Sequence, residues 1–196
     1  MPITEFLNDN GFWEFEGHCQ LCQEQVNDII ELIKTQNLKV MEIGFNAGHS
    51  AEVFLKNNHS LTLTSFDLGI HDYVLKSKSY IDAVFPNRHT LILGDSRTSI
   101  PSYIKNNRDT KFDIIFIDGG HDYEIVKSDL ENCFHLAHKD TVVILDDTMF
   151  TPEWQAAYTI GPTRIWLEYL EQNKIINICK KEYSHGHGMS WGRYIK

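Results

Sequence analysis

Three aspartates and one histidine stand at spacings that suit chemistry on a hydroxyl group. One apolar run ends in Asp118, and His121 follows after two glycines. Another apolar run ends in the pair Asp146 and Asp147. Aspartate oxygens suit a hard cation such as Mg²⁺, Mn²⁺ or Ca²⁺. The imidazole of a histidine, with an ordinary pKa of about 6.5, is mostly free to accept a proton at neutral pH.

Three carboxylates in one cleft repel one another, so either some keep their protons or a cation binds between them. We predict a cation bound by Asp118, Asp146 and Asp147, with Asp118 and His121 as the catalytic residues. A bound cation lowers the pKa of a hydroxyl as it does that of water, and His121 would remove the proton. Because consecutive strand residues point to opposite faces, Asp146 and Asp147 reach one ion only where the strand breaks. The alternative is that these aspartates cap helices and that His121 is merely exposed.

The elements that must position these side chains are short apolar runs alternating with helical patterns. The runs lie at 38–44, 61–67, 89–95, 112–118 and 141–147, and the helices between them near 48–57, 72–84, 97–106 and 122–138. Runs this apolar suit parallel strands that helices cover on both faces. In such a sheet ligands bind outside the carboxyl ends of the strands. The runs end in Glu42/Gly44, Asp67, Asp95, Asp118 and Asp146/Asp147, so we expect an acidic rim there.

The remaining segments complete a single domain over 1–196. We expect an N-terminal helical segment at 1–36 with a helix near 20–36, a cofactor-binding core at 38–147, and a substrate-side segment at 148–196. The last segment holds an aromatic loop (Phe150, Trp154 and Tyr158) that either covers the cleft or belongs to the core, a helix near 163–172 and a terminal hairpin. The predicted fold is α/β, a Rossmann-like doubly wound sheet that is mostly parallel with an antiparallel C-terminal edge strand.

Composition limits the functional classes. The hydrophobic fraction of 42% and the charged fraction of 23% are those of a soluble globular protein, and the net charge of −9 argues against binding nucleic acid. No apolar run approaches the length of about 20 residues that crosses a bilayer. The start lacks the pattern of a signal peptide, so we expect a cytoplasmic protein. Cys19 and Cys22 form a lone C-x-x-C after His18, for which we expect a structural role.

The stretch MEIGFNAGHS at 41–50 indicates a nucleoside-binding turn. Gly44 lets the backbone turn sharply, and Gly48 would let it approach a ligand closely. Asn46 stands where the dinucleotide fingerprint requires glycine, which disfavours an NAD-dependent oxidoreductase. Asp67 can accept both ribose hydroxyls, and Asp95, with Ser96 beside it, can accept from an adenine amine.

These motifs resemble those of the class I S-adenosylmethionine-dependent methyltransferases over about residues 38–147. Glu42-Ile-Gly44-x-x-x-Gly48 is similar to their first motif, Asp67 to their ribose acid and Gly94-Asp95-Ser96 to their adenine-side motif. The resemblance implies that Glu42 and Gly44 lie near the methionine end of the cofactor. The cofactor-binding residues that it implies are Glu42, Gly44, Phe45, Asn46, Gly48, Ser50, Asp67, Asp95, Ser96 and Asp118.

A sharper resemblance is to the metal-dependent O-methyltransferases that act on sugar hydroxyls of macrolides and related small molecules. Their Asp-x-x-His unit and following acidic pair match Asp118-Gly-Gly-His121 and Asp146-Asp147, although the first acid of the pair is often glutamate in those enzymes. Catechol- and caffeoyl-type enzymes have a lysine base where this chain has His121. The resemblance implies methyl transfer from S-adenosylmethionine to a hydroxyl, with Mg²⁺ or a similar ion.

Two alternatives stay open at this point. A metal-independent methyltransferase would use the same cofactor, with the aspartates only capping and hydrogen bonding. A non-catalytic nucleoside-binding or scaffolding protein would keep the pocket without turnover. We expect a sugar or other small molecule as acceptor, no membrane or nucleic-acid partner, and a homo-oligomer suggested by Phe12, Trp13 and Phe15. In a chain this short, we expect the lid segments over the acceptor pocket to be either absent or supplied by a neighbouring subunit.

Overall fold

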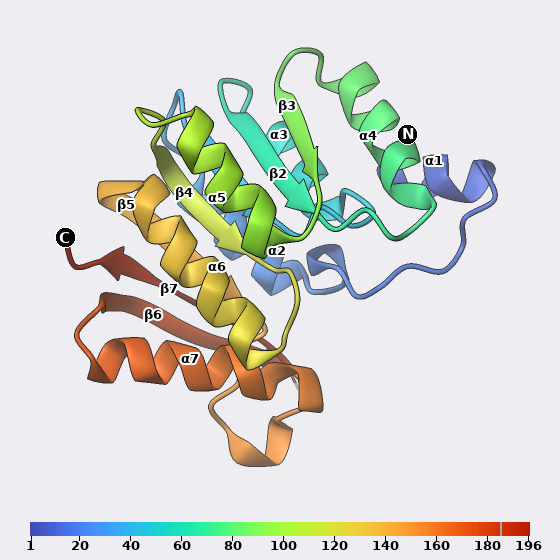
Figure 1. Ribbon diagram of the computed structural model, residues 1–196. Helices are drawn as coiled ribbons and strands as arrows, with labels where there is room; N and C mark the ends of the chain where they lie inside the picture. Colours follow the sequence, from blue (N-terminus) through green and yellow to red (C-terminus); the bar gives the residue numbers. More distant parts are fainter. Residues whose placement is uncertain (185) are drawn as a thin grey trace.

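The computed structural model describes residues 1–184 and 186–196, and its strands form one seven-stranded sheet in the order β3-β2-β1-β4-β5-β7-β6 (Figure 1). The strands are β1 (Lys39–Ile43), β2 (Thr62–Asp67), β3 (His89–Leu93), β4 (Phe112–Ile117), β5 (Ala137–Asp146), β6 (Ile175–Ser184) and β7 (His187–Tyr194). Strands β1 to β5 run parallel, and β7 lies antiparallel between β5 and β6. The predicted fold class is therefore confirmed.

Helices cover both faces of the sheet, as the apolar strands require. One layer holds α1 (Ile3–Asp9), α2 (Gln23–Leu32), α3 (His49–Asn57) and α4 (Tyr73–Val84), and the other holds α5 (Ser96–Asn106), α6 (Tyr123–Leu136) and α7 (Ile160–Glu171). Three short 3₁₀ helices are η1 (Cys19–Leu21), η2 (Pro152–Trp154) and η3 (Ala157–Thr159). No helix in the described part of the chain has the length and apolarity to cross a membrane.

Strand β4 shows why the runs are continuously apolar. Ile114 and Phe116 pack into the core beneath α1–α4, whereas Ile115 and Ile117 pack into the core beneath α5–α7. None of the four is more than 2% exposed. A strand buried on both faces cannot alternate apolar with polar residues.

The sheet register aligns the carboxyl ends of the central strands. Ile43, the last residue of β1, pairs with Phe66 of β2 and with Ile117 of β4, and Ile117 pairs in turn with Leu145 of β5. The residues that follow these positions therefore reach the same edge. This alignment produces the rim that the strand-ending acids predict.

Several boundaries differ from the predicted ones. The helix expected at 20–36 is η1 followed by α2, which ends at Leu32, and α1 was not anticipated. Strand β5 begins at Ala137, directly after α6. The expected terminal hairpin is β6 and β7, with His187 as the first residue of β7, and His185 lies outside the described residues.

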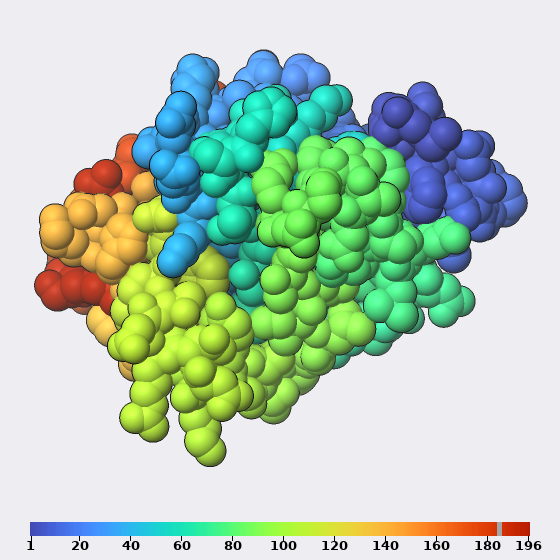
Figure 2. All heavy atoms as spheres, turned by 90° about the horizontal axis from the view of Figure 1, so that it is seen from above, coloured from blue at the N-terminus to red at the C-terminus, as the bar shows by residue number. Residues whose placement is uncertain are grey.

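The N-terminal residues pack along the side of the molecule. In Figure 2 they appear in dark blue against the green of α4. The Tyr80 hydroxyl of α4 donates to the Met1 carbonyl at 2.7 Å, and the backbone N–H of Ile3 donates to Glu52 of α3 at 3.0 Å. These contacts fix the start of the chain near the rim of the sheet.

Candidate active site

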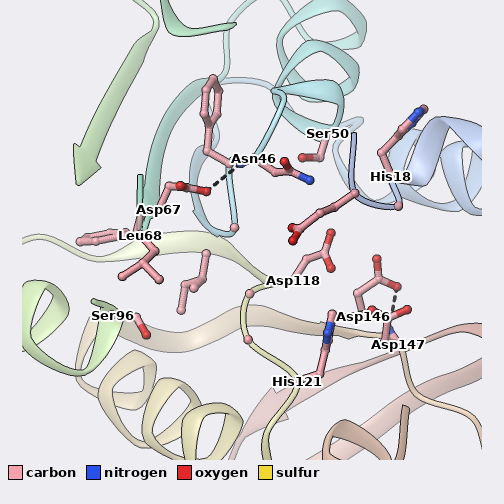
Figure 3. Close-up of a pocket in the computed structure, with 18 of the residues that line it drawn as sticks. His18, Asn46, Ser50, Asp67, Leu68, Ser96, Asp118, His121, Asp146 and Asp147 are labelled. Atoms are coloured by element: carbon pink, nitrogen blue, oxygen red, sulfur yellow. Dashed lines mark hydrogen bonds and ion pairs between the residues drawn. The ribbon is translucent and has the colours of Figure 1, made fainter. Parts of the chain in front are cut away.

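A cavity of about 670 Å³ lies at the carboxyl ends of the parallel strands. The turns after β1 to β5 supply most of its wall, and N-terminal residues between Glu16 and Leu21 supply another part. This volume is in the usual range for small-molecule sites. Figure 3 shows that Asp67 and Ser96 lie toward one end, whereas Asp118, His121, Asp146 and Asp147 gather toward the other.

Asp118, His121 and Asp147 form a group suited to a cation. One ligand atom from each of the three lies within 4.8 Å of the others. His121 Nε2 is shielded from solvent and lies 2.8 Å from Asp147 Oδ2, yet among the described residues it makes no well-directed hydrogen bond. Two carboxylates and an imidazole with an unsatisfied nitrogen fit a divalent ion such as Mn²⁺.

Burial and repulsion shift the ionisation of this group. Burial, followed by repulsion from Asp146 and Asp147, raises the pKa of Asp118 well above its usual range. Contact with the Asp147 carboxylate raises the pKa of His121. Burial, with repulsion from Asp147, raises the pKa of Asp146 to about 8. Such carboxyl groups keep protons at neutral pH unless a positive charge replaces them.

The structure places Asp146 differently from the other two aspartates. Its carboxylate accepts hydrogen bonds at 2.7 Å to both oxygens from Gln25 Nε2, and Oδ1 also accepts from the backbone N–H of Asp147 at 2.9 Å. It lines the cavity but is not in the candidate cation group, whose third member is His121, the candidate base. Asp147 has a φ of 56°, so the strand does break between the two aspartates.

Gly44 brings the first cofactor motif next to Asp118. It has a φ of 96°, and a Cβ at this position would lie 1.9 Å from the Asp118 carbonyl oxygen. Only glycine allows the two turns to touch. Gly48, with a φ of 79°, is the N-cap of α3, and its close neighbours are Ile3 and Phe45. Gly48 does not line the cavity, so it packs against core side chains and not against a ligand as expected.

Glu42 lies beneath the cavity rather than in its wall. It is completely buried and accepts hydrogen bonds at 2.5 Å from each of the Ser50 and Ser65 hydroxyls. Burial raises its pKa to about 7. Ser50 does reach the cavity wall, as do Phe45 and Asn46. Glu42 was expected beside the cofactor. In the structure it reaches the cavity only through its hydrogen bond with Ser50.

Asp67 faces the cavity and is held by backbone donors. Its carboxylate accepts from the N–H of Asn46 and from the N–H of Gly69, both at 2.7 Å. Each carboxylate oxygen has two lone-pair positions, so both can still accept from a ribose hydroxyl. Asn46 itself adopts a left-handed φ of 49° and accepts at 2.7 Å from the Tyr73 hydroxyl.

Asp95 has a partner that the sequence analysis did not anticipate. Its Oδ1 accepts from the backbone N–H and from Nε of Arg97 at 2.9 Å each, and its Oδ2 accepts from Arg97 Nη2 at 2.5 Å. These hydrogen bonds lower the pKa of Asp95 to about 2. Asp95 and Ser96 both line the cavity, with Asp95 as the N-cap of α5.

The N-terminal segment of the same chain supplies part of the cavity wall. Glu16 Oε1 lies 3.2 Å from His71 Nε2, across from the turn after β2. The His18 ring stacks on His49 with centroids 3.6 Å apart, and all four of these residues line the cavity. No hydrophobic periodicity marks this stretch, and its only motif in the sequence is the C-x-x-C of Cys19 and Cys22 after His18.

Of the three loop aromatics, Tyr158 is the one that lines the cavity. Its ring centroid lies 5.6 Å from that of His121. Phe150 packs against the core beneath α5–α7, and Lys180 Nζ lies 4.6 Å from its ring centroid. His187 also reaches the cavity wall from β7. The loop thus contributes one aromatic side chain beside the candidate base.

Comparisons with known proteins agree with this geometry. Residues 41–148 match the family model described as a methyltransferase domain. A comparison with curated proteins gives no match. An O-methyltransferase from Bacillus cereus, solved with S-adenosylhomocysteine, has a TM-score of 0.77 at 19% identity, over 98% of this chain and 90% of that one.

Two further solved structures share the fold. A putative caffeoyl-CoA O-methyltransferase from Staphylococcus aureus has a TM-score of 0.74 at 18% identity, over 97% of this chain and 90% of that one. The TDP-rhamnose 3′-O-methyltransferase CalS11 of calicheamicin biosynthesis has a TM-score of 0.65 at 19% identity, over 88% of this chain and 78% of that one. Because the family model matches more than half of the chain, this protein belongs to the methyltransferase domain family, with the class I, S-adenosylmethionine-dependent architecture.

Proposed function

We propose that this protein transfers a methyl group from S-adenosylmethionine to a hydroxyl of a sugar or another small molecule, with the help of a divalent cation. The observation that carries the proposal is the convergence of Asp118, His121 and Asp147 at one end of a cavity. The other end holds Asp67 and Ser96, the nucleoside-side residues. The donor would lie between them, with its methionine end next to Gly44 and Asp118.

The cation would be held by Asp118 and Asp147, and Mg²⁺ or Mn²⁺ is the expected ion. When bound, it would lower the pKa of the acceptor hydroxyl. The Asp147 contact orients the His121 imidazole, which then accepts the hydroxyl proton. The acceptor oxygen forms a bond to the methyl carbon while the carbon–sulfur bond breaks. The electron pair of the broken bond stays on sulfur. Opposite charges cancel in this step, so exclusion of water by the N-terminal segment and Tyr158 would favour it.

The charge of the cavity wall favours an acceptor without phosphate groups. Among the described residues that line it, Arg97 is the one lysine or arginine, and Asp95 already pairs with it. Glu16 adds a further carboxylate to the wall. An anionic acceptor would meet repulsion there. A free hydroxyl compound therefore suits this wall better than the CoA- or TDP-linked acceptors named for the two neighbours above.

A metal-independent reaction is the second candidate. The 2.8 Å contact between His121 and Asp147 could by itself serve as an oriented base. A chelator separates the two functions. With tritiated S-adenosylmethionine and a panel of sugars and small alcohols, transfer that stops in EDTA and returns with Mg²⁺ supports the metal-dependent function. Transfer that continues unchanged in EDTA supports the other.

A thermal-unfolding panel tests the donor without a known acceptor. S-adenosylmethionine, S-adenosylhomocysteine, NAD and NADP are each added with and without Mg²⁺. A ligand at 100 times its Kd stabilises the folded protein by about 2.7 kcal/mol. We expect a rise in Tm of a few degrees with the first two compounds only. A response to NAD alone would contradict the proposed donor.

A further inference from the structure

Gln25 is a buried polar residue of α2 with no role in the chemistry described above. It is 3% exposed, and its side-chain amide donates to both oxygens of Asp146, which is 7% exposed. The two residues are 121 positions apart in the chain. Burying an amide and a carboxylate is costly unless they pair, so this contact is strongly preferred in the fold. It connects the N-terminal layer directly to the end of β5.

Asp146 transmits this contact to the next residue. Its Oδ1 accepts from the backbone N–H of Asp147, whose φ of 56° is left-handed. Such a φ is uncommon outside glycine, although Asp and Asn adopt it more readily than most residues. The turn directs the Asp147 carboxylate back into the cavity, to within 2.8 Å of His121 Nε2. One continuous chain of hydrogen bonds thus joins Gln25, Asp146 and the backbone N–H of Asp147.

We propose that Gln25 is a positioning residue, which through Asp146 holds the turn that aims Asp147 at the cation. In this arrangement Asp118 and Asp147 contact the ion, and Asp146 supports Asp147 without contacting the ion. The sequence had predicted all three aspartates as ligands. This inference rests on the metal-dependent function proposed above. It explains why Asp146, although it lines the cavity, is absent from the group within 4.8 Å. Its carboxylate is held against the Gln25 amide instead.

The test is the affinity for Mn²⁺, measured by electron paramagnetic resonance on the full-length protein without acceptor. Gln25→Met keeps the length of the side chain but removes the donor, and Gln25→Glu replaces the donor with an acceptor. We expect at least a tenfold loss of Mn²⁺ affinity in both. Gln20→Met is the matched control, because Gln20 also donates to a carboxylate, that of Glu52 at 3.0 Å, and neither Gln20 nor Glu52 lines the cavity. It should bind Mn²⁺ like the wild type.

A double-mutant cycle shows whether Gln25 acts through Asp146. If it does, adding Gln25→Met to Asp146→Ala causes no further loss. Losses that simply add, or unchanged affinity in both Gln25 variants, would overturn the inference while leaving the metal-dependent function in place. If the wild-type protein binds no Mn²⁺, both the inference about Gln25 and the metal-dependent function are contradicted.

A crystal structure with Mn²⁺ provides a measurement that does not depend on how the variants fold. We expect Gln25 to remain bonded to Asp146 while the ion contacts Asp118 and Asp147. An ion ligated directly by Asp146, with the Gln25 amide released, would overturn the inference.

Discussion

At the scale of single residues, the site depends on acids that burial makes costly to ionise. Asp118, Asp146 and Glu42 are all held in surroundings that raise their pKa values, and desolvation is the largest cause in each case. The first two lie where a cation can compensate for the cost. Glu42 has no such partner and relies on two serine hydroxyls. Replacing Glu42 therefore leaves every candidate metal ligand in place.

At alkaline pH, the Glu42→Gln variant should have a larger free energy of unfolding than the wild type. The folded pKa of about 7 lies above the usual value of 4.5, so the folded state holds a proton that the unfolded chain loses first. The stabilising effect is complete below about pH 4 and is lost as pH rises to about 7, at a cost on the order of 3 kcal/mol. Glutamine carries no proton to lose. Urea unfolding at pH 5 and pH 8 measures the difference.

In the same experiment, the two proteins should differ little at pH 5. A pH dependence in Glu42→Gln as steep as that of the wild type would mean that Glu42 is not the group responsible. Both proteins keep Asp118 and Asp146, and loss of the Glu42 charge also removes one cause of the raised pKa of Asp118, which adds to the gain in stability at alkaline pH.

At the scale of elements, the turns after β1 and β4 are built to touch. A side chain at Gly44 would meet the Asp118 carbonyl at 1.9 Å in a backbone conformation that only glycine tolerates well. The contact links the first cofactor motif to the candidate metal ligand. Neither turn can move without the other.

Gly44→Ala should therefore destabilise the protein by several kcal/mol, since both the steric overlap and the positive φ oppose it. Gly17→Ala is the matched control, because nothing lies within 4 Å of a Cβ placed there. Thermal unfolding of the two variants gives the comparison. Equal melting temperatures would mean that the turns are not packed as described.

The five parallel strands were predictable because burial on both faces leaves continuous apolar runs between helical patterns. Helix α1 was not, since Ile3–Asp9 spans only about two turns and its packing partners lie in α3 and α4. Likewise Gln25, Glu16 and Arg97 carry no local signal. Their roles arise from contacts across the fold, which no spacing within the sequence encodes.

At the scale of the whole molecule, the chain brings its N-terminus to the rim that its own parallel strands create. The cavity is lined by Glu16 and His18 from near the start of the chain and by His187 from near its end. The sequence predicted the rim of acids but not this closure. Binding of the donor and binding of the cation should therefore each favour the other.

S-adenosylhomocysteine and Mn²⁺ added together should raise Tm by more than the sum of their separate effects. Each ligand orders turns that the other contacts, because Asp118 lies next to Gly44. Differential scanning calorimetry measures the three shifts. Strictly additive shifts would show that the two halves of the cavity are independent. The Asp67→Ala variant, which alters only the ribose side, should lose the response to S-adenosylhomocysteine and keep that to Mn²⁺.

Anomalous X-ray scattering from a crystal grown with Mn²⁺ and S-adenosylhomocysteine tests the central claim most directly. We expect one manganese peak in direct contact with carboxylate oxygens from both Asp118 and Asp147, next to the sulfur of the bound nucleoside. A cavity that holds the nucleoside but shows no manganese peak between these two side chains would contradict the account.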